Sequence, residues 1–477
     1  MRKTKIVCTL GPASRDEKTL TEMLKAGMNV ARMNFSHGDH EYHRETIEMF
    51  RRVRDRLGVP AAVMLDTKGP EVRIGTFKDG KIMLKAGQDF TLTTLTVEGD
   101  ETRVSVSYAD LPAQLKVGDR ILIDDGLLAL RVKSLTDTDI LCTVEVGGKL
   151  SNRKGVNIPH VHLDLPFLSE RDMEDLRFGV EMDVDYVAAS FVRTAEDIVA
   201  MRNYLDYYGG HNIRIIAKIE NMEGIRNFEA ILKEANGIMV ARGDMGVEVD
   251  YEQLPGIQKR FIRRCYQSGK IVITATQMLE SMTNNINPTR AEITDVANAV
   301  FDGTSAVMLS GETAVGVHPA HVVEVMSRIA EQAEKDAFEI GSYKIPMVHD
   351  CDFEDTTDAI CDAACTTARD LNAAAILTVT RSGYTAQHLS KFRPAEPIVA
   401  GTPEDKTFNQ LALCWGVYPI HARWQSETNV LITHAIDCAK RFGYVRTGDR
   451  VVITAGGTGE AGTTDILTVQ TVPQPIR

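Results

Sequence analysis

Short apolar runs alternate with amphipathic helical patterns over two separate stretches of the chain. The first stretch has apolar runs at residues 5–9, 29–34 and 61–66, with helical patterns at 17–26 and 41–57 between them. The second has apolar runs at residues 186–191, 213–219, 237–240, 271–274 and 306–309. Strands that alternate with helices favour a parallel sheet. Because three strands precede the interruption and five follow it, the pattern predicts a (β/α)8 TIM barrel.

The interruption, residues 69–163, has a different pattern. Segments such as 102–106 and 120–123 alternate apolar and polar positions, and turn signals such as Asp79-Gly80 are closely spaced. This combination predicts an all-β insert. An insert after the third strand lies above the carboxyl ends of the barrel strands, where barrel active sites are found. We therefore expect it to act as a lid.

The chain changes character again after about residue 345. A helical pattern at 356–371 precedes apolar runs at 375–380, 397–401 and 451–454, which predicts a smaller α/β domain. A length of 477 residues also suggests about three domains. We expect an α/β protein with a barrel catalytic domain (1–68 and 164–345), a β-barrel lid domain (69–163) and a C-terminal α/β regulatory or assembly domain (346–477).

Composition narrows the classes of partner. The net charge is −12, which disfavours nucleic acid and anionic membrane surfaces. No apolar segment reaches the ~18 residues that a membrane span needs. The eight cysteines form no CxxC pair, which favours buried free thiols in a reducing compartment. We expect a soluble, cytoplasmic protein.

Polar side chains gather at the ends of the predicted barrel strands, where barrel enzymes carry out their chemistry. They are Arg32, Asn34, Ser36, Asp66, Thr67, Lys68, Lys218, Glu220, Arg242, Asp244, Thr274 and Thr276. Alternation along the fifth strand places Lys218 and Glu220 on the same side. These two alone could be an ion pair that plugs the barrel, but Asp244, from the next strand, adds a second carboxylate. Two carboxylates from neighbouring strands suit Mg²⁺, which leaves positions for substrate oxygens.

Cationic donors accompany these carboxylates and suit an anionic, phosphorylated substrate. They are Arg32, Arg73, Lys154 and Lys218. Gly243 and Asp244 open a predicted helix whose backbone N–H groups can hold a carboxylate. The chain has no GxxxxGK[ST] motif. Gly457, Gly459 and Gly462 fit GxGxxG, but the TTDILTV that follows predicts a strand where a dinucleotide site needs a helix.

Long motifs give the chain a resemblance to the pyruvate kinase family. In chain order they are TKIVCTLGPAS, NVARMNFSHG, LDTKGPEVR, NRKGVNIP, AKIEN, GIMVARGDMGVE, ITATQMLESM, NPTRAE and VMLSGETA. They span the barrel and the edges of the insert, and the C-terminal domain matches more loosely. The resemblance implies that phosphoenolpyruvate gives its phosphoryl group to ADP, which forms ATP and enolpyruvate, and that the enolate is then protonated to pyruvate.

The resemblance also implies two metal sites. Glu220 and Asp244 would hold Mg²⁺, or Mn²⁺ in its place. K⁺ would be held by Asn34, Ser36, Asp66 and the carbonyl of Thr67. Glu71, in KGPE, resembles the version of that motif found in K⁺-dependent members.

The remaining roles follow from the same motifs. Arg32 and Lys218 would hold the transferring phosphoryl group, and Lys218 would also neutralise the enolate oxygen. The amides of Gly243 and Asp244 would bind the substrate carboxylate. Thr276 would position that carboxylate and the proton delivered to the enolate. The nucleotide would be bound by Arg73, Lys154, Asn34 and His37.

Two further features resemble regulatory parts of the family. Arg290, in NPTRAE, resembles a residue that reaches across a subunit interface in homotetramers, although a local pair with Glu292 is the alternative. A turn resembles the loop that binds the phosphate of a sugar-phosphate activator, although it could be an ordinary strand-to-helix turn; its residues are Thr380, Arg381, Ser382, Gly383 and Thr385. The loop 456–464 lacks the Trp and Arg of the fructose-bisphosphate-activated pattern, so a sugar phosphate or a nucleotide effector fits equally.

Two other functions remain as alternatives. A lyase acting on phosphoenolpyruvate would use Glu220, Asp244 and the cations, but it would not need Arg73, Lys154 or the K⁺ set. A non-catalytic sensor would keep the fold and the effector turn, but it should have lost at least one residue of a set that is complete here.

Overall fold

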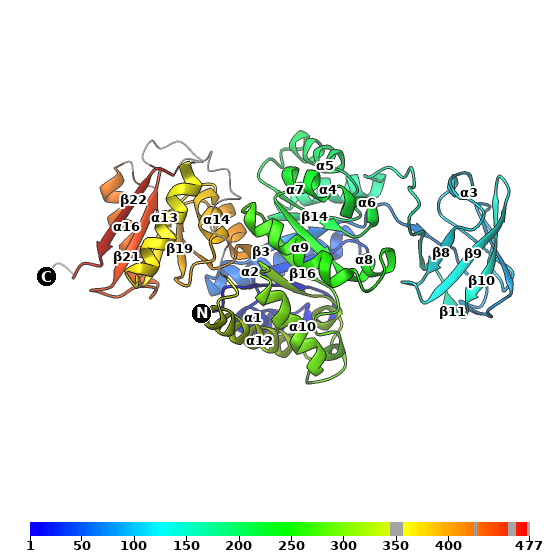
Figure 1. Cartoon of the computed structure of the whole chain (residues 1–477), viewed down its shortest axis with the longest axis horizontal. Helices are drawn as coiled ribbons and strands as arrows, with labels where there is room; N and C mark the ends of the chain where they lie inside the picture. Colours follow the sequence, from blue (N-terminus) through cyan, green and yellow to red (C-terminus); the bar gives the residue numbers. More distant parts are fainter. Residues whose placement is uncertain (344–355, 424, 426, 457–463, 475–477) are drawn as a thin grey trace.

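The centre of the molecule is a closed barrel of eight parallel strands, in the order β1-β17-β16-β15-β14-β13-β3-β2 (Figure 1). The computed structural model describes residues 1–343, 356–423, 425, 427–456 and 464–474. The barrel strands are β1 (Lys5–Thr9), β2 (Val30–Asn34), β3 (Ala62–Asp66), β13 (Tyr186–Ala189), β14 (Arg214–Ile219), β15 (Gly237–Ala241), β16 (Ile271–Ala275) and β17 (Ala306–Leu309). The predicted TIM barrel is therefore confirmed.

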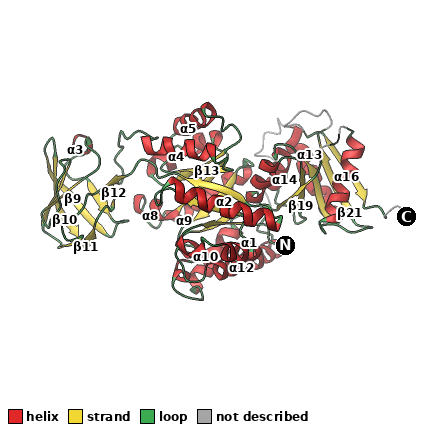
Figure 2. Ribbon diagram, turned by 180° about the vertical axis from the view of Figure 1, so that it is seen from behind, coloured by secondary structure: helices red, strands yellow, loops and turns green. Residues whose placement is uncertain are grey.

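Helices follow the strands and cover the outside of the barrel (Figures 1 and 2). The longer ones are α1 (Glu17–Ala26), α2 (His40–Leu57), α4 (Glu170–Glu181), α5 (Ala195–Tyr207), α9 (Leu254–Gln267), α10 (Arg290–Phe301) and α12 (Pro319–Ile340). The shorter ones are α6 (Met222–Arg226), α7 (Phe228–Glu234), α8 (Arg242–Glu248) and α11 (Gly311–Ala314), with 3-10 turns at Pro12–Ser14 and Glu280–Thr283. Within the described residues, no helix has both the length and the apolar character needed to cross a membrane.

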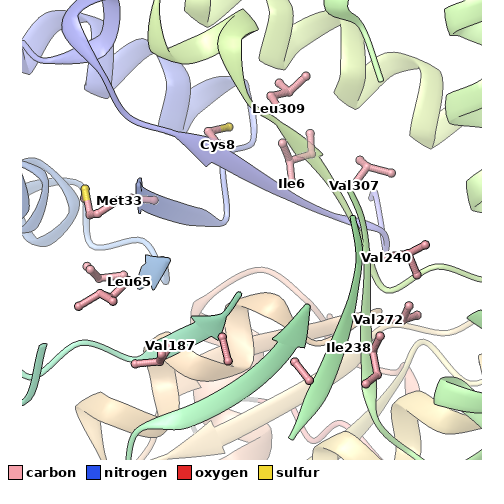
Figure 3. Packing of buried hydrophobic residues seen from close by; sticks show 14 of the residues in the cluster. Ile6, Cys8, Met33, Leu65, Val187, Ile238, Val240, Val272, Val307 and Leu309 are labelled. Atoms are coloured by element: carbon pink, nitrogen blue, oxygen red, sulfur yellow. The ribbon is translucent and has the colours of Figure 1, made fainter. Parts of the chain in front are cut away.

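Each barrel strand divides its side chains between two cores, because successive residues of a strand face opposite ways. Ile6 and Cys8 of β1 join the core between the barrel and its helices (Figure 3). Val7, between them, joins a second core on the other face, together with Met64 and Ile216. The strands are thus apolar on both faces, as expected of a parallel sheet that is covered on both sides.

The insert between β3 and β13 is a mostly β unit with its own core, as the predicted fold class requires. Its seven-stranded sheet has the order β4-β12-β8-β9-β10-β6-β7, with a separate pair β11-β5. The strands are β4 (Val72–Arg73), β5 (Lys81–Leu84), β6 (Asp89–Thr93), β7 (Arg103–Ser105), β8 (Arg120–Ile123), β9 (Leu128–Leu135), β10 (Asp139–Val146), β11 (Gly148–Ser151) and β12 (Gly155–Asn157), with one short helix, α3 (Leu111–Gln114). An isolated bridge between Ile74 and Val106 joins the two edges of the sheet.

The C-terminal unit is a five-stranded sheet with the order β20-β19-β18-β21-β22, in which only β22 runs antiparallel to its neighbour. The elements are α13 (Thr356–Asp370), β18 (Ala375–Val379), α14 (Tyr384–Lys391), β19 (Ile398–Thr402), α15 (Asp405–Gln410), a 3-10 turn at Leu411–Leu413, β20 (Val417–His421), α16 (Thr428–Arg441), β21 (Arg450–Ala455) and β22 (Ile466–Thr471). This unit and the insert lie at opposite ends of the barrel (Figures 1 and 2).

Two features of the glycine-rich C-terminal segment bear on the dinucleotide motif. Gly457, Gly459 and Gly462 lie outside the described residues. The segment that follows them is the strand β22, not a helix, and it pairs with β21. This agrees with the exclusion of a dinucleotide fingerprint.

Candidate active site at the barrel mouth

Lys218 is the centre of the polar cluster at the carboxyl ends of the barrel strands. Its side chain comes from β14 and is buried, with 9% of the residue exposed. Its Nζ lies 3.1 Å from Oδ1 of Asp66, 2.7 Å from Oγ of Ser190 and 3.0 Å from Oε1 of Glu220. Burial favours the neutral amine, but Asp66 and Glu220 outweigh it and hold the pKa of Lys218 above its ordinary value. The ammonium is therefore a fixed positive charge.

Arg32, at the end of β2, adds a second cation beside Lys218. Its Nε donates to Oδ2 of Asp66 at 2.6 Å, and one terminal nitrogen donates to Oγ1 of Thr9 at 2.7 Å. Burial opposes ionisation of Asp66, but Arg32 and Lys218 together keep its pKa below the ordinary value. One carboxylate thus holds two cations side by side, which leaves other N–H groups of the guanidinium for an anion.

Glu220 and Asp244 supply the two carboxylates with room for a cation. Oε2 of Glu220 accepts a hydrogen bond of 2.6 Å from the amide of Phe191. Burial raises the pKa of Glu220 to about 7; Lys218 counteracts this rise and the charge of Asp244 adds to it. Burial also raises the pKa of Asp244. Among the described residues, the Asp244 carboxylate has no hydrogen-bond or ion-pair partner, so its oxygens are available to a ligand.

A metal ion at this place would depend on those two carboxylates. Within the described part of the chain, no group of three or more His, Cys, Asp or Glu side chains is arranged to hold a metal ion. Two carboxylates fit Mg²⁺ better than a metal that needs a complete protein cage, because Mg²⁺ keeps several water or substrate ligands.

Thr276 and Gly243 meet across the ends of β16 and β15. The amide of Gly243 donates to Oγ1 of Thr276 at 2.8 Å. Thr276 has φ +67°, in the left-handed region that β-branched residues rarely adopt. Arg242 holds this loop, since its guanidinium donates to the carbonyl of Thr276 at 2.6 Å and pairs with Asp295 at 2.7 Å. The hydroxyl and the α8 amide are therefore brought together at one side of the mouth.

The residues expected to hold K⁺ lie at the ends of β2 and β3. Oδ1 of Asn34 accepts from the amide of Ser36 at 3.1 Å. The carbonyl of Thr67 accepts from Oγ of Ser190 at 2.6 Å. The carboxylate of Asp66, between them, contacts Arg32 and Lys218. Oxygens of all four expected ligands are thus present at adjacent strand ends, and each has capacity for a further partner.

Three of the four residues expected to bind nucleotide line a cavity between the insert and the barrel. The cavity has a volume of about 780 Å³, and His37, Arg73, Lys154 and Asp244 are among its lining residues. Lys154 pairs with Asp124 at 2.8 Å. Arg73 pairs with Glu71 at 2.7 Å. Asn34 does not line this cavity. Arg73 and Lys154, the cations expected to bind phosphate, are thus held by carboxylates of the insert at the edge of this cavity.

The C-terminal turn that resembles an effector loop is internally braced. Gly383 has φ +83° and its amide donates to Oγ1 of Thr380 at 2.9 Å, before α14 begins. Thr385 pairs its hydroxyl with that of Thr464 at 2.6 Å. Arg381 lies 3.7 Å from Glu404. The carbonyl of Ser382 accepts from Arg214, the first residue of β14, at 2.8 Å. The turn is thus tied to the strand that carries Lys218.

Arg290 begins α10 and is exposed. The carboxylate of Glu292 is bonded instead to Ser281 and to the capping residue Thr289. Among the described residues, Arg290 therefore has no ion-pair partner, and the local pair with Glu292 is not formed.

Sequence reasoning missed Ser190, which touches Lys218, Asp66 and Thr67. The apolar run predicted a strand through residue 191, whereas β13 ends at Ala189 because Phe191 turns to φ +56°. The available signal was the rule used for the other strands, that a polar residue just past a strand end faces the mouth.

Comparison with known proteins gives the family. The model of the pyruvate kinase barrel domain matches residues 1–323, and that of the pyruvate kinase alpha/beta domain matches residues 358–470. A pyruvate kinase of Clostridium acetobutylicum is 47% identical over 481 residues, which cover 99% of this chain and all of that protein. A pyruvate kinase of Staphylococcus haemolyticus is 48% identical, across all of this chain and 81% of its own length. The chain belongs to the pyruvate kinase family of phosphotransferases.

Proposed function

We infer that the barrel mouth is where this chain acts as a pyruvate kinase, moving a phosphoryl group from phosphoenolpyruvate to ADP. The bond between phosphorus and the enol oxygen breaks, and a new bond forms to the terminal phosphate oxygen of ADP. The enolate that remains takes one proton at its methylene carbon and becomes pyruvate. The observation that carries this proposal is the position of the Lys218 ammonium, whose Nζ lies 3.1 Å from Oδ1 of Asp66 and 3.0 Å from Oε1 of Glu220.

Lys218 and Arg32 are the residues we assign to the transferring group. Phosphoryl transfer needs alignment and neutralisation of charge more than covalent participation by the protein. Asp66 holds both cations, so their charges are fixed before substrate arrives. Lys218 also lies where it can neutralise the enolate oxygen as the phosphoryl group leaves.

Glu220 and Asp244 are the residues we assign to Mg²⁺, or to Mn²⁺ in its place. Two neighbouring carboxylates support this assignment: Glu220 is buried, and Asp244 is half-buried and has no partner among the described residues. We assign Asn34, Ser36, Asp66 and the Thr67 carbonyl to K⁺ on the chemistry of their oxygens. When bound, these cations would neutralise charge on the substrate's phosphate and carboxylate oxygens.

The other end of the substrate we assign to α8 and β16. The amides of Gly243 and Asp244 and the hydroxyl of Thr276 would bind the carboxylate and direct the proton to the enolate. Arg73, Lys154, Asn34 and His37 would bind ADP, and closing of the insert over the cavity would bring Arg73 and Lys154 to its phosphates.

A coupled assay tests the function. We expect pyruvate from phosphoenolpyruvate only when ADP and a divalent cation are both present, with K⁺ raising the rate. Replacing K⁺ by a large organic cation should depress the rate strongly. Pyruvate without ADP would favour the lyase alternative. Effector binding without any product would favour the sensor.

Regulation, assembly and location are also proposals. We propose that a sugar phosphate or a nucleotide binds the turn from Thr380 to Thr385 and activates the enzyme, which the link from Ser382 to Arg214 supports. Arg290 is exposed and has no ion-pair partner in the described part of the chain, which supports a contact across a homotetramer interface. We propose a cytoplasmic protein, and the domain boundaries 1–68 with 164–345, 69–163 and 346–477. Activity titrations against a panel of sugar phosphates and nucleotides test the effector.

A further inference from the structure

The ammonium of Lys218 faces as many protein oxygens as it has N–H groups, two through hydrogen bonds and one through an ion pair. An ammonium carries three N–H donors. Its Nζ has three oxygens within reach, on Asp66, Ser190 and Glu220, at 3.1, 2.7 and 3.0 Å. Since Lys218 must point a donor at the phosphoryl group in the proposed function, one of these contacts must be given up.

Two of the three contacts of Lys218 are to carboxylates, and each carboxylate also has another binding partner or an assigned ligand. Asp66 also binds Arg32 at 2.6 Å, so it fixes both cations. Glu220 is one of the two carboxylates assigned to the divalent cation. A metal ion at Glu220 would compete with Lys218 for Oε1, since Oε2 already accepts from the amide of Phe191. Glu220 is therefore the contact that Lys218 loses.

Ser190 is the neutral contact that can remain. Ser190 is buried, with 2% of the residue exposed. Its backbone is fixed in place because its amide donates to Oγ1 of Thr67 at 3.1 Å. The hydroxyl has a single proton, and the carbonyl of Thr67 at 2.6 Å is its best acceptor. Because the Ser190 hydroxyl donates its hydrogen to the Thr67 carbonyl, Oγ of Ser190 is left to accept a hydrogen bond from Lys218. Ser190 thus links Lys218 to the end of β3 without bringing a charge.

We propose that Ser190 is a positioning residue that holds the Lys218 ammonium in place while Glu220 is transferred from Lys218 to the divalent cation. This inference rests on the proposed function. No bond to the substrate is made by Ser190; it keeps the freed N–H of Lys218 aimed into the mouth. Without the hydroxyl, Lys218 would turn fully to Glu220 and compete more strongly with the metal ion.

The test is Ser190→Ala, read by two measurements. We expect kcat to fall between about tenfold and a hundredfold, since hydrogen bonds to charged groups are of that strength. We also expect Mn²⁺ to bind the variant several-fold more weakly when free Mn²⁺ is followed by electron paramagnetic resonance, without substrate. Ser190→Thr, which keeps the hydroxyl, should restore both values toward wild type.

Ser390→Ala is the matched control. Ser390 is buried, and its hydroxyl donates to the carbonyl of Trp415 at 2.7 Å and accepts from Arg393 at 3.1 Å. It repeats the pattern of a serine between a carbonyl and a cation, away from the mouth. We expect kcat and Mn²⁺ affinity to stay at wild-type values in this variant.

Unchanged Mn²⁺ affinity in Ser190→Ala overturns the proposal, whether or not kcat falls, and so does a kcat within twofold of wild type. Should Ser190→Ala not fold, Ser190→Cys keeps the size, weakens the hydrogen bond and is judged by the same readouts. Wild-type protein that makes no pyruvate with ADP contradicts the proposed function instead. The Mn²⁺ titration does not depend on turnover, so the two failures are distinguishable.

Discussion

The buried charge of Lys218 is tolerated because Asp66 and Glu220 contact it. We therefore expect that Lys218 can be replaced without unfolding the protein. Lys218→Met removes the cation but keeps an unbranched side chain of similar length. Glu220 already has a pKa of about 7 with Lys218 present, so it can take up a proton when that cation is lost. We expect a folded variant whose kcat falls by at least about 10²–10³-fold, the usual effect of removing one such donor. Steady-state kinetics and thermal unfolding measure the two effects separately.

Lys259→Met is the control for loss of a lysine charge, since Lys259 is exposed on α9 and pairs with Asp302. Its kcat should match wild type. Near-normal turnover in Lys218→Met would contradict the role given to Lys218.

Asp358, on α13, makes the C-terminal unit sensitive to acid. Burial opposes its ionisation, but His388 and Lys391, each 2.7 Å away, outweigh burial and lower the pKa of Asp358 to about 2. Because the folded pKa lies below the unfolded value of about 3.9, the carboxylate stabilises the fold above pH 4, and this contribution is lost as the pH falls toward 2. Its size is on the order of 2 kcal/mol.

Asp358→Asn removes that contribution at every pH. We expect the difference in unfolding free energy between wild type and variant, measured in denaturant, to shrink from pH 5 to pH 3. A constant difference over this range would show that the ion pairs with His388 and Lys391 do not stabilise the unit.

At the residue scale, the sequence predicted which charged residues lie at the barrel mouth, but not which side chains they contact there. Strand alternation was sufficient for Lys218 and Glu220, because Lys218 lies in β14 and Glu220 directly follows its last residue, Ile219. Ser190 was not predicted, because its orientation depends on where β13 ends. The left-handed backbone of Phe191 cannot be recognised from the pattern of apolar residues. The pairing of Asp66 with two cations from other strands follows only from closure of the barrel.

Among elements, the barrel strands were predictable because each is a short apolar run buried on both faces. The strand β20 was not predicted. Its sequence, VYPIH, contains Pro419, which cannot donate to a neighbouring strand and reads as a break. In the fold β20 is the edge of its sheet and pairs only with β19, so the missing donor costs nothing there.

Close packing at the start of β15 predicts a site that admits no side chain. A Cβ on Gly237 would lie 2.7 Å from the carbonyl oxygen of Ile271 and 2.8 Å from the side chain of Ile216. We expect Gly237→Ala to lower the unfolding free energy by about 1–3 kcal/mol, the usual effect of overpacking a core. Denaturant unfolding measures it.

Gly256 gives a control of opposite sign. It lies in α9, it is exposed, and a Cβ there would have no neighbour within 4 Å. Gly256→Ala should therefore stabilise the protein, by up to about 1 kcal/mol, because alanine restricts the unfolded chain. Equal effects of the two substitutions would mean that contact with Ile271 and Ile216 is not what excludes a side chain from Gly237.

In the whole molecule, the two units attached to the barrel differ in how they are joined to it. The insert has a core of its own, which includes Phe90 and Leu130 and no barrel strand. The C-terminal unit also has a core of its own, which includes Leu377 and Ile453. It additionally shares one continuous core with the barrel, since Val7 and Ile216 cluster with Ile376. Polar contacts reinforce that junction, among them Lys5 to the carbonyl of Val417 at 2.6 Å and Tyr186 to the carbonyl of Gln410 at 2.7 Å.

This difference predicts that the insert can be removed and the C-terminal unit cannot. The amides of Gly69 and Ser169 both donate to the carboxylate of Asp172, at 3.0 and 3.1 Å, so the two ends of the insert lie close together. Replacing residues 70–166 by a short glycine-serine linker should leave a barrel that unfolds within a few degrees of the full chain, because Phe167, which joins the barrel core, is kept. It should lose ADP-dependent turnover, because Arg73 and Lys154 are gone.

Ending the chain at residue 343 should instead destabilise the barrel. The truncation exposes the shared core and leaves the buried Lys5 without the carbonyl of Val417 as its hydrogen-bond acceptor. Scanning calorimetry on both shortened chains decides between them. A truncated chain that unfolds cooperatively at the full-length temperature, beside a lid-less chain that aggregates, would mean that the shared core contributes less to stability than the insert does. The barrel would then depend on the insert for folding, and any movement of the insert during turnover would act against the stability of the whole protein.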